Sequence, residues 1–471
     1  MWIYLLGILS NYLIAWGYEE AIGNQHSCEI INEFVNKKDQ FQCSLDEYDI
    51  FSEALNKAAT KRKIGIIGCF GTDHVIPTID IAKWLVLRGH DVVFYGPLHM
   101  QKKIELSGAK FVPYPEQNIT FKNNREKEEM EQKIIAYGAI VKVDYFINNN
   151  LPWFLESCEK ENFDGIIFHH FAIFGFAVAK YLNLPNLCLT CGAVPPEREK
   201  IGDDYPKNWK KRKIDFSAEV QKQVPYIGEI SKKVHSCSNV GKVLMVTPKK
   251  FVEAIANRTI KESYRYIHLS SIMSKNSHDY VPELKENSLI YFAFGTIFTR
   301  YSQDIYDSVA KFFCGTKYEL IMTTGGNEEL YQYLLPKYSN CSNISINLYV
   351  NQMEVLRRTA IFINHAGFNS VQEAIPLIIP MIVIPQGADQ YAIARCIHSL
   401  KIGINFRDLK WTITQNLRYA LNEIEKNFTN YKENIKKVLK THFDGEKLED
   451  SIIKVENYLF NSTRINKKLM F

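Results

Sequence analysis

Short apolar runs alternate with amphipathic stretches from residue 61 onwards, and this alternation predicts an α/β fold. Residues 63–70 (KIGIIGCF) form a buried-strand pattern, and a helical pattern begins near Pro77, a residue suited to a first helical turn. The helical pattern ends at Gly89, and Asp91–Tyr95 is the next strand. A strand, a helix and another strand in this order form a β-α-β unit, which implies a parallel sheet.

The pattern continues through the first half of the chain and starts afresh after a polar segment. Helical patterns cover residues 125–162 and 173–182, on either side of a strand at 165–168. The charged, proline-containing stretch 195–235 reads as a long loop, and loops of this length are commonly functional. A second alternating series begins at residues 288–294. Its later strands are predicted at residues 318–322, 344–350, 360–364 and 381–384.

The length of 471 residues exceeds the roughly 250–300 residues that one hydrophobic core usually supports, so we expect two domains. We predict two doubly wound α/β domains that face each other across a cleft, where ligands bind beyond the carboxyl ends of the strands. The predicted parts are an N-terminal apolar segment and extension (1–60), a first domain (61–270), a linker (271–287), a second domain (288–445) and a C-terminal helix with a polar tail (446–471).

The composition excludes several classes of protein. An apolar fraction of 46% excludes a disordered or fibrous chain. A net charge of +5 over this length does not by itself indicate nucleic-acid binding. The ten cysteines are scattered, and the only CxxC, Cys188–Cys191, has no second pair that would complete a zinc site.

The compartment is predicted from the N-terminal segment and from glycosylation sequons. Residues 1–17 are apolar apart from Ser10 and Asn11, which fits a signal-peptide core, although the missing Lys and Arg of an n-region count against it. The alternative is a buried or surface-lying helix. Cys28 and Cys43 could close a disulfide loop in an oxidising compartment. We expect the secretory pathway or association with the endoplasmic reticulum membrane, with the cytoplasm as the alternative. Six sequons agree with the first location, at Asn118, Asn257, Asn340, Asn343, Asn427 and Asn461.

The most informative stretch follows the predicted strand at residues 360–364. A strand that turns through Gly367 into a helix presents free backbone N–H groups, and the helix dipole also favours an anion there. His365, Asn369 and Ser370 add side-chain donors, so the turn is a plausible cradle for a diphosphate.

Acidic and amide side chains follow at positions suited to sugar hydroxyls. Glu373, one turn along the helix, would accept hydrogen bonds from a vicinal diol such as ribose. Asp389 and Gln390 follow the next strand and are suited to the hydroxyls of a second sugar. Taken alone, Gly367 is more often an ordinary turn glycine, and Glu373 is more often a solvated helix residue. The interpretation therefore depends on the order and spacing of the whole set.

In this stretch the sequence resembles the UDP-dependent glycosyltransferases of the GT-B fold. The matching segment is YVNQMEVL, eight residues, then HAGFNSVQEAIPLIIPMIVIPQGADQ, beginning at Tyr349. It is most similar to the branch of macrolide glycosyltransferases and of animal and plant UDP-glycosyltransferases. GTDHVIP at residues 71–77 and LRGHDV at 87–92 extend the resemblance, which covers residues 61–440. It implies an acceptor-binding first domain and a donor-binding second domain.

The resemblance also implies a role for each matching residue. Tyr349 replaces the usual Trp that stacks on uracil, and Gln352 meets the edge of the base. Thr296 occupies the position of a phosphate-contacting hydroxyl, and Asn351 replaces the usual Pro. The other implied donor residues are His365, Asn369 and Ser370 at the diphosphate, with Gly367 in the turn, Glu373 at the ribose, and Asp389 and Gln390 at the transferred sugar.

His74 stands where the family has its general base, and a neutral imidazole suits the removal of an acceptor proton. The family's Asp partner follows the strand at 165–168, but here the position holds His169. A protonated His169 would oppose protonation of His74. Three outcomes stay open: His74 works alone at a reduced rate, another acid substitutes, or activity is lost.

The leading hypothesis is an inverting glycosyltransferase that moves a hexosyl group from a UDP-sugar to a hydroxyl of a lipophilic small molecule. One alternative is a GT-B-fold protein that binds a ligand or nucleotide with weak or lost catalysis, and another is a sterol or lipid glycosyltransferase. The resemblance implies no cofactor and no metal ion. The expected partners are the UDP-sugar and the acceptor, without nucleic acid, and with a membrane contact through residues 1–17.

Overall fold

The chain divides into a unit of residues 1–57 and a unit of residues 58–471, and every residue with a described position belongs to the second. The computed structural model describes residues 60–69, 72–115, 150–172, 174–190, 243–257, 265–267, 284–285, 288–295, 302–387, 389–408, 412–443 and 448–460. The predicted loop at 195–235, the cysteines Cys28 and Cys43 and the apolar start therefore lie outside the described residues.

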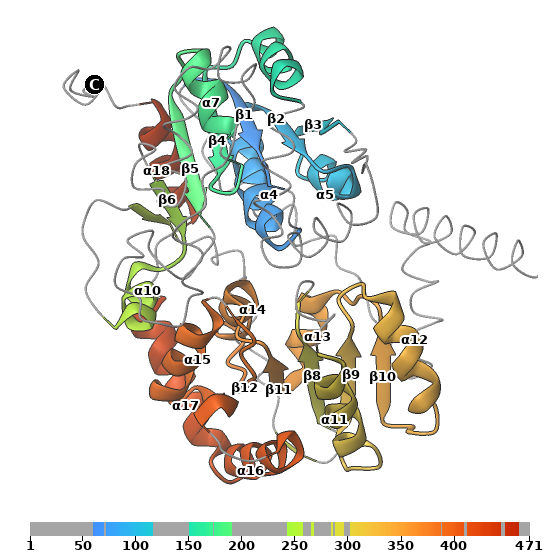
Figure 1. Ribbon diagram of the computed structural model, residues 1–471. Coiled ribbons are helices and arrows are strands. Elements are labelled where there is room, and N and C mark those ends of the chain that lie inside the picture. The colour runs from blue at the N-terminus through green and yellow to red at the C-terminus, as the bar shows by residue number, and fades with distance from the viewer. Residues whose placement is uncertain are drawn as a thin grey trace, which may run out of the picture. The chain divides into compact units, whose positions relative to one another are not determined.

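Seven parallel strands form the first sheet in the described part of the chain, in the order β3-β2-β1-β4-β5-β6-β7 (Figure 1). The chain moves outward from β1 to β3 on one side and from β4 to β7 on the other. The winding direction therefore reverses between β1 and β4. The strands are β1 (Lys63–Ile67), β2 (Asp91–Gly96), β3 (Lys110–Pro113), β4 (Gly165–His169), β5 (Asn186–Thr190), β6 (Val243–Val246) and β7 (Arg265–Ile267).

Helix α4 (Thr72–Leu87) follows β1, and its start differs from the prediction. The helix begins five residues before Pro77, which lies inside it. Pro77 has no N–H to donate to the carbonyl of the residue four before it, so one bond near the helix start is missing. Apolar burial outweighs that loss, because Val75, Ile81 and Leu85 are fully buried. The other helices of this region are η1 (Leu98–Met100), α5 (Gln101–Glu105), a helix at residues 150–161, α7 (Phe174–Tyr181) and α10 (Lys249–Ala256).

Six parallel strands form the second sheet among the described residues, in the order β10-β9-β8-β11-β12-β13 (Figure 1). Its winding direction reverses between β8 and β11. The predicted strands of the second series are confirmed to within a few residues, although the strand predicted at 344–350 is shorter. The strands are β8 (Leu289–Ala293), β9 (Glu319–Thr323), β10 (Ile344–Asn347), β11 (Thr359–Asn364), β12 (Met381–Val383) and β13 (Gly403–Asn405).

Helices on both faces bury the second sheet. Along β8, Tyr291 joins one apolar cluster while Ile290 and Phe292 join the other, as the two-residue period of a strand requires. The helices are α11 (Gln303–Phe313), α12 (Glu328–Lys337), α13 (Gln352–Arg358), α14 (Phe368–Ala374), α15 (Gln390–Ser399), η8 (Phe406–Asp408), α16 (Ile413–Lys426) and α17 (Phe428–His442).

Two helices each pack against the sheet that is farther from them in the sequence. Helix α18 (Leu448–Phe460) follows the second sheet in the chain but packs against α4, β4 and β5 of the first (Figure 1). Gly165 permits this approach, since a Cβ there would lie 3.1 Å from atoms of Leu459. Conversely, Phe251 of α10 belongs to the apolar core of the second sheet, with its ring 4.9 Å from that of Phe443. The predicted domain boundaries stay predictions.

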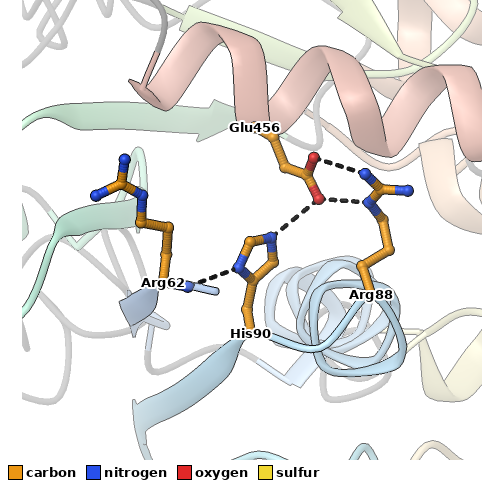
Figure 2. Close-up of polar contacts among 4 residues, drawn as sticks. All are labelled: Arg62, Arg88, His90 and Glu456. Atoms are coloured by element: carbon orange, nitrogen blue, oxygen red, sulfur yellow. Dashed lines mark hydrogen bonds and ion pairs between the residues drawn. The ribbon is translucent and has the colours of Figure 1, made fainter. Parts of the chain in front are cut away.

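A buried polar cluster fastens α18 to the first sheet (Figure 2). The Glu456 carboxylate accepts hydrogen bonds from Nε and Nη2 of Arg88, at 2.5 and 2.9 Å, and pairs with Nε2 of His90 at 3.0 Å. The Arg62 N–H donates to Nδ1 of His90 at 3.1 Å, so the hydrogen of a neutral His90 sits on Nε2 and points at Glu456. Burial raises the pKa of Glu456, but the bonds from His90 and Arg88 outweigh it, so the pKa lies below its ordinary value.

In the part of the chain that the structure describes, no helix combines the length and the apolar character needed to cross a bilayer.

Candidate functional site

Most of the predicted donor residues gather at one edge of the second sheet. Because all its strands are parallel, the segments that follow β8, β9, β10, β11 and β12 leave from the same edge. The turn after β11 lies at the reversal point, beside the end of β8, and the rings of Phe294 and His365 are 6.1 Å apart. Reversal points of open α/β sheets are where ligands bind.

The turn from β11 into α14 has a strained backbone at Ala366. This residue has a φ of +61°, so the left-handed position falls on Ala366 and not on the following glycine. The Asn364 side chain supports the turn, because its Oδ1 accepts the Ala366 N–H at 2.7 Å. Gly367 is needed for close approach, since a Cβ there would lie 2.4 Å from Nε2 of His365.

Gln352, the residue predicted at the edge of the base, bonds directly to Glu373, the residue predicted at the ribose. Its Nε2 donates to the Glu373 carboxylate at 2.5 Å and lies 3.4 Å from the Ser370 hydroxyl. Its Oε1 accepts from the Tyr291 hydroxyl at 3.3 Å. The start of α13 and one face of α14 therefore present an amide, a hydroxyl and a carboxylate within hydrogen-bonding distance of one another.

The two residues predicted at the transferred sugar lie at the start of α15. Gln390 is buried, and its Oε1 accepts the backbone N–H groups of Gln386 and Gly387 at 2.8 and 3.2 Å. The Gln390 amide therefore stabilises the conformation of the loop after β12. Asp389 is the residue before the helix and is half-buried. Thr296 lies outside the described residues.

The predicted base and its partner position fall on either side of the reversal point in the first sheet. His74 is the third residue of α4, the helix that follows β1, whereas the predicted helix start near Pro77 left it in the loop before the helix. His169 is the last residue of the neighbouring strand β4, paired in parallel with β1. The topology thus brings the backbone positions of these two residues to one edge of the sheet.

His169 is fully buried at the end of β4. Its Nδ1 accepts the Phe171 N–H at 3.1 Å, and its ring lies 4.3 Å from that of His170. Asp164 is at the opposite end of β4, where its carboxylate accepts the Lys63 N–H at 2.7 Å and pairs with Arg62. Asp164 therefore lies at the wrong end of the strand to replace the missing carboxylate.

The sequence interpretation missed two residues of the donor edge. In the sequence, Tyr291 looks like one more apolar residue of β8, yet its hydroxyl donates a hydrogen bond to Gln352. Burial and, to a smaller extent, the charge of Glu373 raise the pKa of Tyr291, so its hydroxyl stays protonated and remains a donor. Asn364 reads as the end of a strand. It is fully buried, and its Nδ2 has no hydrogen-bond partner among the described residues. The only sequence signal for Asn364 was its place directly before His365.

Replacing Tyr291 with phenylalanine is expected to weaken UDP binding about two- to tenfold, because Gln352 loses one neutral hydrogen bond. Calorimetric titration with UDP measures the change. The ring stacks on Phe362 at 5.0 Å, and that contact is kept in the variant, so the melting temperature serves as a control. An unchanged dissociation constant would show that Gln352 does not need this bond.

Among the described residues, no group of three or more His, Cys, Asp and Glu side chains is arranged to hold a metal ion.

Comparison with known proteins finds glycosyltransferases similar to this chain. Residues 266–456 match the family model described as UDP-glucoronosyl and UDP-glucosyl transferase. An uncharacterized UDP-glucosyltransferase of Bacillus subtilis, YojK, is 24% identical over 414 residues, which cover 82% of this chain and 96% of that protein. The NDP-glycosyltransferase YjiC of the same organism is 26% identical over 350 residues, covering 73% and 84%.

Solved structures share the fold. The glycotransferase of kitacinnamycin superposes with a TM-score of 0.60 at 17% identity, covering 85% of this chain and 99% of that one. This chain therefore has the GT-B fold of glycosyltransferases, which confirms the predicted fold class. The family model and the relatives make the second half of the chain similar to UDP-glycosyltransferases, and the resemblance seen in the sequence is confirmed.

Proposed function

We propose that the protein is an inverting glycosyltransferase that moves a hexosyl group from a UDP-sugar to a hydroxyl of a lipophilic small molecule. The observation that carries the proposal is the cluster of Gln352, Ser370 and Glu373 at the reversal point of the second sheet. It lies in the part of the chain that matches the family model. The lipophilic acceptor is suggested by resemblance alone.

In this proposal each donor residue contacts a different part of the UDP-sugar. Tyr349 stacks on the uracil and Gln352 meets its edge, while Glu373 exchanges its bond from Gln352 for bonds from the ribose hydroxyls. Thr296 contacts a phosphate, Asp389 and Gln390 hold the transferred sugar, and the diphosphate rests on His365, Asn369 and Ser370.

Asn364 supports the placement of an anion at this turn. A buried donor without a partner costs about 1–3 kcal/mol, so its retention beside His365 favours a ligand that accepts its hydrogen bond. The strained φ of Ala366 supports the same placement, because such strain is concentrated at functional sites.

His74 acts as the general base in the proposed reaction. It takes the proton of the acceptor hydroxyl as that oxygen bonds to the anomeric carbon. The bond from the anomeric carbon to the β-phosphate oxygen breaks with its electron pair, and UDP leaves. A single displacement of this kind inverts the configuration at the anomeric carbon. We expect transfer to persist after dialysis against EDTA, because protein side chains hold the leaving diphosphate.

A second candidate function is nucleotide or ligand binding with weak or lost catalysis. It is favoured by His169, which is buried where the family has an Asp and provides no negative charge for the base. A related sterol or lipid glycosyltransferase is a third candidate.

Acceptor-dependent release of UDP tests these candidates. The purified full chain is incubated with UDP-glucose or UDP-glucuronic acid and with a panel of phenols and sterols. TDP-glucose is included, because the structural relative SsfS6 of Streptomyces sp. SF2575 is complexed with thymidine diphosphate (TM-score 0.52, 13% identity, covering 84% of this chain and 99% of that one). The proposal predicts UDP release with an acceptor and little without one. UDP binding without release, under every combination, would instead support the second candidate.

We also propose that the protein matures in the secretory pathway. Cys314 and Cys341 form a disulfide with Cα atoms 5.3 Å apart, and such bonds persist mainly in oxidising compartments. Of two neighbouring sequons, Asn340 is exposed, whereas the Asn343 amide bonds to Gly315, Phe313 and Tyr318. Asn340 is therefore the better glycan acceptor. A membrane contact through residues 1–17 belongs to the same proposal.

Peptide mapping without reduction tests this location in protein secreted from eukaryotic cells. The linked peptide of Cys314 and Cys341, and a glycan that Asn340→Gln removes, are the expected results. Alkylation of Cys314 before reduction would contradict the proposal.

A further inference from the structure

Tyr349 is a large aromatic side chain left mostly in solvent. It lies between β10 and α13, and 68% of its surface is exposed. An exposed ring can offer its π face to a nucleotide base, but it stacks well only if its orientation is fixed before the base arrives. A neighbouring segment must therefore fix the orientation of this ring.

Gly326 lies directly against the tip of the ring. It belongs to the loop between β9 and α12 and has a φ of +84°, a left-handed conformation that favours glycine. A Cβ at this position would lie 1.9 Å from the Tyr349 hydroxyl oxygen and 2.4 Å from Cζ. Any larger residue must therefore displace the ring, and the exposure of Tyr349 leaves it room to rotate away.

The same loop also holds the backbone next to Tyr349. The N–H of Gly326 and the hydroxyl of Thr323 both donate to the Leu348 carbonyl at 3.0 Å. The N–H of Thr324 donates to the Asn347 carbonyl at 2.9 Å. One short segment, residues 323–326, thus holds the backbone before Tyr349 and lies against the tip of its ring.

We infer that Gly326 is a positioning residue for the nucleotide base, acting through the ring of Tyr349. This rests on the proposed function, because it needs a base to stack on Tyr349. Gly326 itself need not touch the ligand. Its missing side chain leaves the ring where the base arrives, and its N–H holds the adjacent backbone.

Gly315 provides a matched control. It too has a left-handed backbone, with a φ of +71°, but nothing lies within 4 Å of a Cβ added there. Alanine at either position introduces a similar backbone strain, whereas only Gly326→Ala displaces the aromatic ring.

Calorimetric titration of UDP into Gly326→Ala, Tyr349→Ala, the double variant and Gly315→Ala tests the inference. We expect the dissociation constant to rise about tenfold in each of the two single variants, the loss of one stacked base, and no further in the double variant. Gly315→Ala should bind UDP as the wild type does. With UDP-sugar the KM should rise and kcat should change little, a division that general loss of structure would not give.

Three results would overturn the inference. Equal weakening in Gly326→Ala and Gly315→Ala would assign the effect to backbone strain. Wild-type affinity in Gly326→Ala, alongside weakened binding in Tyr349→Ala, would refute the role of Gly326 and leave the proposed function intact. No UDP binding by the wild-type protein would refute the proposed function and this inference with it.

Discussion

Replacing His74 with alanine is expected to lower kcat about a hundred- to ten-thousand-fold, the usual contribution of a general base. UDP binding should be unchanged, because the proposed donor residues lie on the second sheet while His74 begins a helix of the first. Single-turnover kinetics measures the chemical step, and calorimetric titration with UDP measures the binding.

His398→Ala is the control for this variant, since His398 is an exposed histidine of α15. It should retain wild-type turnover. If His74→Ala also turns over as fast as the wild type, the assignment of the base is wrong. If both variants lose UDP binding, the substitutions have disturbed the fold and not the reaction.

The second large effect is expected at α18, where Glu456→Ala should lower the free energy of unfolding by about 3 kcal/mol. The variant leaves the Arg88 guanidinium buried without its carboxylate, and it removes the acceptor for Nε2 of His90. The side chains of Arg88 and Glu456 are only 6% and 13% exposed, so water cannot replace the lost partner. Urea unfolding measures the loss.

Glu433→Ala is the matched control, because Glu433 and Lys436 form a surface ion pair with side chains 61% and 50% exposed. Such pairs contribute at most about 1 kcal/mol, so this variant should unfold near the wild-type midpoint. Equal losses in the two variants would contradict the proposed fastening of α18.

The contribution of Glu456 should also depend on pH with a defined sign. Its pKa in the folded protein lies below the ordinary value of 4.5, because the bonds from His90 and Arg88 outweigh burial. The carboxylate therefore stabilises the fold fully above pH 4.5 and less as the pH falls through the folded pKa. The stability difference between wild type and Glu456→Gln should shrink over that range.

The sequence was sufficient to predict the fold class because buried parallel strands appear as short, continuous apolar runs between amphipathic helices. Residues 289–294 and 360–363 are apolar throughout, as strands covered on both faces must be, and both strands are confirmed. The start of α4 was missed, because Pro77 signals a first helical turn whereas the helix begins at Thr72 and already buries Val75 before Pro77.

The candidate site was predicted where residues are close in sequence and missed where the fold brings them together. His365, Ser370 and Glu373 follow one strand, so their spacing was visible. Tyr291 and Gln352 are 61 residues apart, and only the sheet order makes them neighbours. The packing of α18 on the first sheet is equally non-local, and no periodicity in the sequence points to it.

The pairing of Cys314 with Cys341 was also missed. The two residues lie 27 positions apart, at the end of α11 and after α12. Their Cα atoms come within 5.3 Å because α11 packs on β9 and α12 on the neighbouring strand β10. A count of ten scattered cysteines does not indicate which of them pair.

Calorimetric titration of UDP into the wild-type protein and into Glu373→Ala decides whether the edge of the second sheet binds a uridine nucleotide. We expect saturable binding at one site per chain in the wild type. Binding should be at least tenfold weaker in the variant, because the ribose loses a carboxylate partner. No UDP binding by the wild type, or equal affinity in both proteins, would contradict binding at this edge.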